Sequence, residues 1–368
     1  MPKSTFTVRA PGRVSVMGGH VDYNGGPVIP IAIPLYIELH LEATGGNTVE
    51  LYAEEIDRRD AFVLDQLQPQ HSWIDYVQGV AVELAQLGIP LHGFRGTVKS
   101  TLPMAAGLSS SAALEVASAL AFLHLAKISL SPTEIALLCQ RAENKFVGVQ
   151  CGILDQTAIA ACRADHALLL YCNSMEMEQI PFALQEHVLV VTYSGAPREL
   201  ASSAYNQRRA SCQEALIILQ QHKPHIQQLC DLSPDDLPLA QKVLSPQLFQ
   251  RARHVITEID RTKQSAAALK KEDWNRLGEL MDQTHNSLRD DYEVSSKELN
   301  WLVDWARKHP GVLGSRLTGA GFGGCTVTLI RKENATAFMR ALPAAYHAFS
   351  GIQPQCWTVT AVDGARVL

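Results

Sequence analysis

The sequence lacks the features that would place this chain in a membrane, a disulfide framework or a nucleic-acid complex. No run of about 18 apolar residues occurs, and the first residues contain no apolar signal segment. The eight cysteines are scattered without a Cys-x-x-Cys pair, which indicates reduced and mostly buried thiols rather than disulfides or a zinc site. Acidic residues outnumber basic ones, 37 to 32, so the net charge is −5, and there is no basic tract. We therefore expect a cytoplasmic protein that handles small molecules, with no nucleic-acid and no membrane partner.

The chain does contain enough apolar material for two domains of ordinary size. Of its 368 residues, 46% are hydrophobic and 19% are charged, as in globular proteins. Apolar runs at 167–171 and 188–193 predict two strands, and we place the domain boundary between them. The expected domains are residues 1–180 and 181–368.

The most informative stretch runs from Leu102 to Ser118. A loop of small residues with three consecutive serines leads into an alanine-rich segment that is predicted to be a buried helix, 108–126. Small residues let a backbone approach a ligand, and the first turn of a helix offers free N–H groups and a positive dipole end. These features indicate a phosphate site, and a serine hydroxyl there can also bind the magnesium of a nucleotide. No Gly-Lys-Ser/Thr follows, so this is not a Walker A loop. The alternative is a serine that caps an ordinary buried helix.

Two other loops carry isolated polar side chains. Val14–Met17 predicts a short strand that ends in a glycine-rich loop with His20 and Asp22, and Arg13 lies just before it. The loop 148–156 carries one acidic residue, Asp155. Taken alone, the first loop also fits a solvated hairpin, and Asp155 also fits a turn or cap residue.

Glycines are concentrated at 314–324, before an apolar strand, and indicate close backbone packing. Phosphoryl transfer is suggested by the combination of two glycine-rich elements, a helix start suited to phosphate, and lone Arg, His and Asp side chains. That reaction needs a phosphate cradle, Mg²⁺, a positioned acceptor hydroxyl and positive charge near the transferred group.

Three separated stretches resemble the signature motifs of the GHMP small-molecule kinases, and specifically of their galactokinase branch. They are Gly12-Arg13-Val14 followed by Gly18-Gly19-His20-Val21-Asp22-Tyr23-Asn24-Gly25-Gly26, then Gly107-Leu108-Ser109-Ser110-Ser111-Ala112-Ala113-Leu114-Glu115-Val116, and Gly314-Ser315-Arg316-Leu317-Thr318-Gly319-Ala320-Gly321-Phe322-Gly323-Gly324-Cys325. The segments 142–156, 200–209 and 285–295 are also similar to galactokinases, so the resemblance covers nearly the whole chain in order.

This resemblance implies an α+β fold of two domains with the active site in the cleft between them. The N-terminal domain would resemble domain 2 of ribosomal protein S5, and the C-terminal domain would be ferredoxin-like. The implied activity is that of an ATP-dependent sugar 1-kinase, which transfers the γ-phosphoryl group of ATP to the anomeric O1 of D-galactose or a galacto-configured analogue, with Mg²⁺ as cofactor. Such enzymes are often monomers, and we expect a monomer or a weak homodimer.

The resemblance also gives each matching residue an expected role. Asp155 would accept or orient the proton of the anomeric hydroxyl, and Arg13 would keep this carboxylate ionised and stabilise the transferred charge. Ser111 and Glu143 would hold Mg²⁺. The expected phosphate-binding residues are Ala105, Gly107, Ser109 and Ser110, and the expected sugar-binding residues are Gly19, His20, Asp22, Gly152 and Tyr205.

One departure from the family pattern bears on the substrate. Galactokinases typically read Gly-Glu-His-x-Asp where this chain has Gly19 in place of Glu. The missing Glu normally accepts a hydrogen bond from the C6 hydroxyl, a contact of about 1.5–3 kcal/mol. Its absence opens space and removes a negative charge, so D-galacturonate, with a C6 carboxylate, and L-arabinose, with no C6, join D-galactose as candidates. His20 as a carboxylate contact would favour galacturonate.

Two further departures do not touch the proposed chemistry directly. An arginine that lies near the nucleotide in the family is displaced by one position to Arg198, and Thr157 replaces the usual aromatic. Two alternative functions remain. One is a non-catalytic sugar sensor, against which the retained serines and Asp155 argue. The other is a GHMP kinase of mevalonate or homoserine type, against which residues 22–24 and 151–156 argue.

Overall fold

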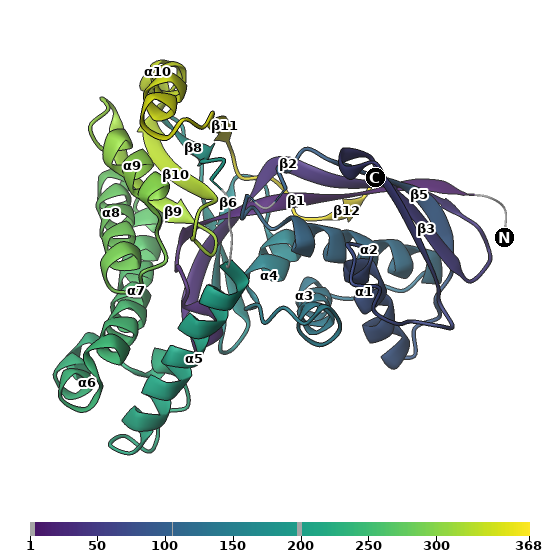
Figure 1. The fold of residues 1–368 in the computed structure, drawn as a ribbon, viewed down its shortest axis with the longest axis horizontal. Helices are drawn as coiled ribbons and strands as arrows, with labels where there is room; N and C mark the ends of the chain where they lie inside the picture. Colours follow the sequence, from purple (N-terminus) through teal and green to yellow (C-terminus); the bar gives the residue numbers. More distant parts are fainter. Residues whose placement is uncertain (1–3, 105, 197–200) are drawn as a thin grey trace.

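A computed structural model describes residues 4–104, 106–196 and 201–368 of the chain, and its described strands form two sheets (Figure 1). The first sheet has the strand order β12-β1-β2-β5-β3-β4, with β6 paired to β2 and β7 paired to β6. Its neighbouring strands are antiparallel, except that β3 and β5 are parallel. The strands are β1 (Thr5–Met17), β2 (Pro27–Ala43), β3 (Thr48–Ala53), β4 (Arg58–Val63), β5 (Phe94–Ser100), β6 (His166–Tyr171), β7 (Glu176–Pro181) and β12 (Arg366–Val367).

Strand β1 is longer than the sequence pattern predicted. The sequence predicted only the short strand Val14–Met17 here, yet β1 runs from Thr5 to Met17, and its pairing with β2 shifts register between Pro11 and Gly12. A register irregularity of this kind lets a strand continue past a proline, which has no N–H to donate. The strand therefore carries Arg13 directly to its end, beside the loop that holds His20 and Asp22.

Four helices pack on one face of this sheet (Figure 1). They are α1 (Asp75–Gln86), α2 (Ser110–Ala126), α3 (Pro132–Ala142), which continues as a π-helical turn η3 (Glu143–Val147), and α4 (Leu154–Ala161). Helix α2 contacts α1, α3, α4 and strands β1 and β2, and most of its side chains are buried, as its apolar sequence predicted. A capping box of Ser131 and Glu134 begins α3. The centre of the N-terminal core is thus the helix whose first turn carries the serines.

The second sheet has the order β11-β8-β10-β9 and is antiparallel throughout. Its strands are β8 (His187–Tyr193), β9 (Val312–Thr318), β10 (Cys325–Arg331) and β11 (Gln355–Val359). The accompanying helices are α5 (Ala201–Gln220), α6 (Leu237–Val243), α7 (Pro246–Lys270), α8 (Trp274–Asp290), α9 (Lys297–Ala306) and α10 (Lys332–Ser350). The short turns are η1 (Asp22–Asn24), η2 (Glu54–Ile56), η4 (Leu229–Asp231) and η5 (Pro234–Asp236). The glycine-rich segment was expected only to precede a strand, but its first part is itself strand β9, against which α8 packs.

The chain changes sheets between β7, which ends at Pro181, and β8, which begins at His187. Strand β7 lies between the predicted strands 167–171 and 188–193, in the stretch where we placed the domain boundary. The short strand β12 returns to the first sheet and pairs with Val8 and Arg9 of β1. The division into residues 1–180 and 181–368 remains a prediction, and the last residues pack with the first part of the chain.

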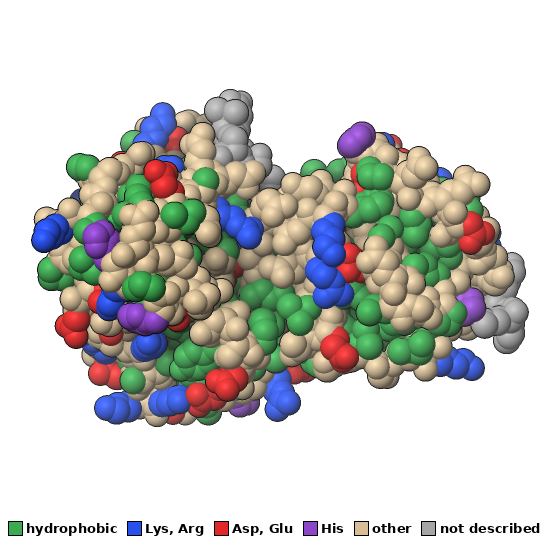
Figure 2. Space-filling model, turned by 90° about the horizontal axis from the view of Figure 1, so that it is seen from below, with side chains coloured by type: hydrophobic (Ala, Val, Ile, Leu, Met, Phe, Trp, Pro, Cys, Tyr) green, Lys and Arg blue, Asp and Glu red, His purple; other side chains and the backbone are tan. Residues whose placement is uncertain are grey.

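The surface of the molecule is mixed in charge. On the face shown in Figure 2, acidic and basic side chains are interspersed over both lobes. Within the described ranges, no helix has both the length and the apolar character needed to cross a membrane.

Candidate active site

A cavity of about 720 Å³ collects side chains from segments far apart in the sequence. Its walls come from the end of β1 and the following loop, the start of α2, the π-helical turn and the loop before α4, helix α5, and β9 with the turn after it. Twelve of the predicted site residues line it: Arg13, Gly19, His20, Asp22, Gly107, Ser109, Ser110, Ser111, Glu143, Gly152, Asp155 and Tyr205. Ala105 and Arg198 lie outside the described residues.

Arg13 and Asp155 form a two-pronged ion pair in this cavity. Arg13 Nε donates to Asp155 Oδ1 at 2.6 Å, and Nη2 donates to Oδ2 at 2.7 Å. Arg13 Nη1 also donates to the carbonyl oxygen of Gly107 at 2.8 Å. The Arg13 side chain is 6% exposed and that of Asp155 is 32% exposed. The arginine is therefore fixed by burial and hydrogen bonds, while the carboxylate stays open to the cavity.

The start of α2 is positioned to receive an anion. Ser109 precedes the helix with φ 66° and ψ 45°, and its hydroxyl does not cap the helix. Instead, Ser109 Oγ donates to Asp155 Oδ2 at 2.6 Å. The first N–H groups of α2 are therefore left without a side-chain cap where Ser110 and Ser111 line the cavity. This arrangement favours the phosphate interpretation over the capping one, although the Ser109 hydroxyl itself is directed to Asp155 rather than to a phosphate.

A buried carboxyl pair lies beside the serines. Gln156 Nε2 donates to Glu143 Oε2 at 2.7 Å and to Glu115 Oε2 at 3.0 Å. Burial raises the pKa of Glu143 to about 7, opposed by hydrogen bonds from side chains that include Ser111. Burial, and then the charge of Glu143, raise the pKa of Glu115 well above its ordinary value. Glu143 therefore holds a proton readily when no cation is near.

These side chains suit a nucleotide-bound magnesium ion. Among the described residues, no group of three His, Cys, Asp or Glu side chains could hold a metal by itself. Magnesium bound with a nucleotide needs only one or two protein oxygens, because phosphates and water supply the others. Glu143 and Ser111, both at the cavity wall, offer such hard oxygen ligands.

Asp22 faces the same cavity from the turn η1. Its pKa is raised to about 6, mainly by burial and then by the neighbouring charge of Asp155. Hydrogen bonds from the backbone N–H groups of Tyr23 and Leu154 oppose this shift. A Cβ atom placed on Gly152 would overlap the Asp22 carboxylate. Gly152 was expected to bind sugar, and the structure shows that it makes room for the side chain of Asp22.

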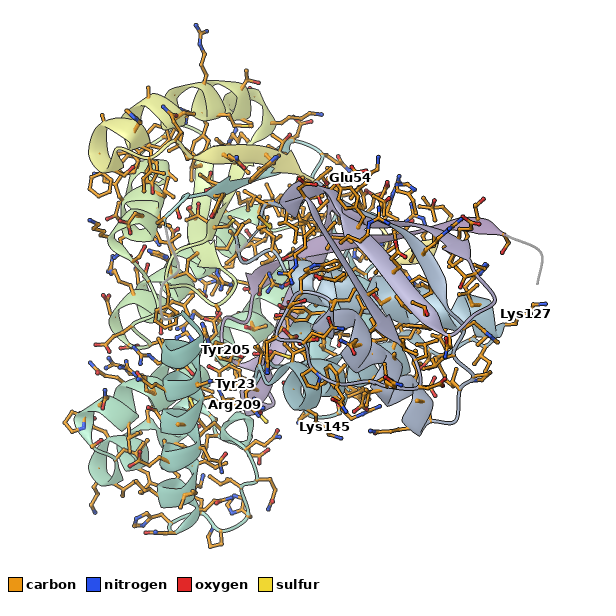
Figure 3. The ribbon with its side chains drawn as sticks, turned by 45° about the vertical axis from the view of Figure 1, so that its right-hand side comes forward. Tyr23, Glu54, Lys127, Lys145, Tyr205 and Arg209 are labelled. Carbon is orange, nitrogen blue, oxygen red and sulfur yellow. The ribbon has the colours of Figure 1, made fainter. Side chains whose placement is uncertain are left out.

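His20 lies in an aromatic cluster with Tyr23, Tyr205 and Tyr292, and Figure 3 shows Tyr205 of α5 next to Tyr23. Its Nδ1 is 3.0 Å from the Tyr23 hydroxyl, and its Nε2 is 3.0 Å from the Ala320 carbonyl oxygen. Burial lowers the pKa of His20 to about 3, so the ring is neutral. The expectation that His20 contacts a carboxylate is therefore not supported, because both ring nitrogens have protein partners and the ring carries no charge.

The sequence analysis gave no role to one positively charged residue of the cavity wall, Arg316. It was quoted only as part of a glycine-rich motif, yet it lies on β9, is fully buried and reaches the cavity wall. An arginine inside a buried strand with no other charged residue is the signal that identifies it, because such a charge is buried only with partners or a function.

The similarity of the chain to known proteins agrees with this geometry. Residues 75–163 match the family model of the GHMP kinases N terminal domain, residues 265–348 that of the GHMP kinases C terminal region, and residues 2–40 the galactokinase galactose-binding signature. A galactokinase of Roseiflexus sp. (strain RS-1) is 44% identical over 97% of this chain and 91% of its own length. The chain belongs to the galactokinase family of GHMP kinases. It is a sugar kinase, a phosphotransferase whose family membership implies ATP as co-substrate.

Other relatives of this sugar kinase extend the comparison. A galactokinase of Bos taurus is 40% identical over 99% of this chain and 92% of its own length. The crystal structure of Lactococcus lactis galactokinase complexed with galactose superposes with a TM-score of 0.95 at 34% identity, covering 99% of this chain and 95% of that one. The mevalonate kinase of Methanococcus jannaschii, at 19% identity and a TM-score of 0.71, shares the fold alone. The predicted family and the two-domain GHMP kinase fold are confirmed.

Proposed function

We propose that this kinase transfers the γ-phosphoryl group of ATP to the anomeric oxygen of a galacto-configured sugar, with Asp155 as the base. The observation that carries the proposal is the Arg13–Asp155 pair, held by hydrogen bonds of 2.6 and 2.7 Å beside the uncapped start of α2. The galactose in the Lactococcus lactis complex and the names of the relatives support the galacto configuration.

In the proposed reaction, the proton of the O1 hydroxyl passes to the Asp155 carboxylate as O1 attacks the γ-phosphorus. The new O1–phosphorus bond forms while the bond from the γ-phosphorus to the β–γ bridging oxygen breaks, and ADP leaves. Arg13 keeps a positive charge between Asp155 and the Gly107 carbonyl, beside the transferred group. Gly107, Ser110 and the first N–H groups of α2 would hold the phosphates. Magnesium bound with the nucleotide would neutralise phosphate charge, with Ser111 and Glu143 as its protein ligands.

On the sugar side, Asp22 and Tyr205 offer polar groups at the cavity wall, and Gly19 and Gly152 shape it. His20 acts indirectly, by holding Tyr23 and the turn at Ala320. The candidate sugars are D-galactose, D-galacturonate and L-arabinose, which share the anomeric hydroxyl and the ring configuration.

The test is a Mg²⁺–ATP assay that detects both ADP and the sugar 1-phosphate, run on Asp155→Asn and Arg13→Lys. Loss of a positioned base lowers kcat by about 10²–10⁴-fold, while ATP still binds. Arg9→Lys is a matched control, because Arg9 lies on the same strand and pairs with Glu38 at the same 2.6 Å, but outside the cavity.

Full turnover by Asp155→Asn would refute the assignment of the base. An unaltered protein that binds ATP and sugar but releases no ADP would favour the sensor function instead.

A further inference from the structure

One guanidinium group reaches the cavity with a donor from which no group of the described residues accepts. Arg316 Nε donates to the Leu317 carbonyl oxygen at 3.0 Å, and Nη1 donates to that of Val16 at 2.9 Å. Within the described part of the chain, Nη2 donates no hydrogen bond, although the Arg316 side chain is only 1% exposed. A guanidinium donor at the wall of a cavity can donate to a ligand that enters it.

Gly19 and Arg316 lie next to each other at the wall of the cavity. A Cβ atom placed on Gly19 would lie 2.7 Å from Arg316 Nη2. The φ angle of Gly19 is outside the left-handed region, in contrast to that of Gly18 at 89°. The backbone therefore does not require glycine at position 19, and the effect of glycine there is that the guanidinium lies directly against it at the cavity wall.

Hydrogen bonds fix the backbone at residue 19. Glu258 Oε1 accepts from the N–H groups of Gly18 and Gly19 at 3.0 and 3.1 Å, and the Gly19 carbonyl oxygen is 2.9 Å from His254 Nε2. Glu258 itself, on helix α7, is fully buried. Residue 19 is thus held in place by the hydrogen bonds of its backbone. The cavity wall that Gly19 and Arg316 form is therefore part of the folded structure.

The charges around Arg316 do not balance. Glu258 is its one ion-pair partner among the described residues, at 4.0 Å from Nη1, and Glu258 also pairs with Arg261 at 2.9 Å. One carboxylate therefore serves two guanidinium groups. The histidines nearby add no charge, since burial lowers the pKa of His20 and His285 to about 3 and that of His254 to about 4. The result is a local surplus of positive charge around Glu258, at the part of the cavity wall that Arg316 forms.

We propose that Arg316 Nη2 binds a carboxylate of the substrate, so that the preferred sugar is a galacto-configured uronic acid, D-galacturonate. The proposal rests on the proposed 1-kinase function and names its substrate class. A carboxylate offers both an acceptor for Nη2 and the negative charge that the site lacks. The C6 hydroxyl of D-galactose supplies an acceptor without the charge, and L-arabinose supplies neither. The carboxylate takes no part in the phosphoryl transfer, which occurs at O1.

The first experiment measures kcat/KM of the full chain with Mg²⁺–ATP for D-galacturonate, its neutral methyl ester, D-galactose and L-arabinose. We expect D-galacturonate to exceed D-galactose and the methyl ester by roughly 10- to 100-fold, the range for a hydrogen bond to a charged group. The methyl ester keeps the size of the acid and removes only its charge.

The second experiment compares Gly19→Glu with Gly19→Gln. Both side chains meet Arg316 and Leu288 in the same way, so steric effects are matched, and thermal melting checks that both variants fold. A glutamate would pair with Arg316, and we expect it to abolish the preference for D-galacturonate and to improve D-galactose relative to Gly19→Gln. The binding of D-galacturonate is also measured by calorimetry without nucleotide.

The outcomes separate the two proposals. If D-galactose or L-arabinose is phosphorylated and D-galacturonate is not, the carboxylate site is refuted while the 1-kinase function stands. If no sugar is phosphorylated, the 1-kinase function fails, and calorimetry alone decides the site. Tighter binding of D-galacturonate than of its methyl ester by the unaltered protein supports the site, and equal or absent binding of the two refutes it.

Discussion

The carboxylate of Asp22 occupies the place that a side chain at position 152 would take. A Cβ atom on Gly152 would overlap both Oδ2 and Cγ of Asp22, so the loop before α4 can pass the turn η1 only as glycine. Asp22 in turn lies close enough to Asp155 for that charge to raise its pKa. The loop glycine thus allows the Asp22 carboxylate to lie close to the proposed base.

Gly152→Ala is therefore expected to displace Asp22 rather than to unfold the protein. Moving a positioned carboxylate weakens sugar binding, and misplacement by about 1 Å can cost on the order of 10²-fold in rate. We expect KM for the sugar to rise and kcat to fall, while the affinity for ATP, which depends on the start of α2, is unchanged. Steady-state kinetics with each substrate varied in turn measure the three effects.

Gly46→Ala is the matched control for this substitution. Gly46 lies in an exposed turn, where an added Cβ would have only one neighbour, the Thr44 hydroxyl at 3.9 Å. The Gly46→Ala substitution should leave all kinetic constants unchanged. An unaltered sugar KM in Gly152→Ala would show that the Asp22 carboxylate does not bind sugar.

The sequence predicted those site residues that lie within contiguous motifs. Arg13, Asp155 and the serines of α2 each belong to a short pattern of glycines and polar residues at an element boundary, and such a pattern is visible in one dimension. The central buried helix followed from its composition, because a helix that is apolar on all sides has no surface face.

The pairings within the site could not be predicted in the same way. Ser109 binds Asp155, 46 positions away, and Gln156 joins Glu115 to Glu143. These contacts depend on how α2, α3 and α4 pack. Arg316 was overlooked because its ion-pair partner Glu258 lies on helix α7, about 60 positions away in the sequence and in no recognised motif.

Asp22 is expected to make the stability of the ligand-free protein depend on pH. Its pKa is raised from 3.8 to about 6 in the folded state, so the folded state binds more protons than the unfolded state between these values. Stability contributed by this group therefore falls as pH rises from about 4 to about 6 and stays lower above that. The change corresponds to at most about 3 kcal/mol.

Asp22→Asn tests this dependence. We expect the variant to match the unaltered protein near about pH 4 and to melt at a higher temperature near about pH 8, because the buried charge is gone. Thermal unfolding followed across this range measures the difference. A difference that is constant with pH would mean that Asp22 is not the group responsible.

Glu143 is expected to release a proton when magnesium and ATP bind. In the absence of a cation, burial holds its pKa at about 7, so a sizeable fraction of the carboxyl is protonated at neutral pH, and a bound cation requires the ionised form. Calorimetry of Mg²⁺–ATP binding in two buffers of different ionisation enthalpy should show proton release. This release should be largest below about pH 7, where it approaches one proton, and should disappear above about pH 8.

Glu143→Gln should abolish this proton release and weaken magnesium binding. Glu54→Gln should change neither, since Glu54 is exposed and lies far from the cavity (Figure 3). Identical proton release in Glu143→Gln and the unaltered protein would remove Glu143 from the magnesium site and leave Ser111 as its remaining proposed ligand.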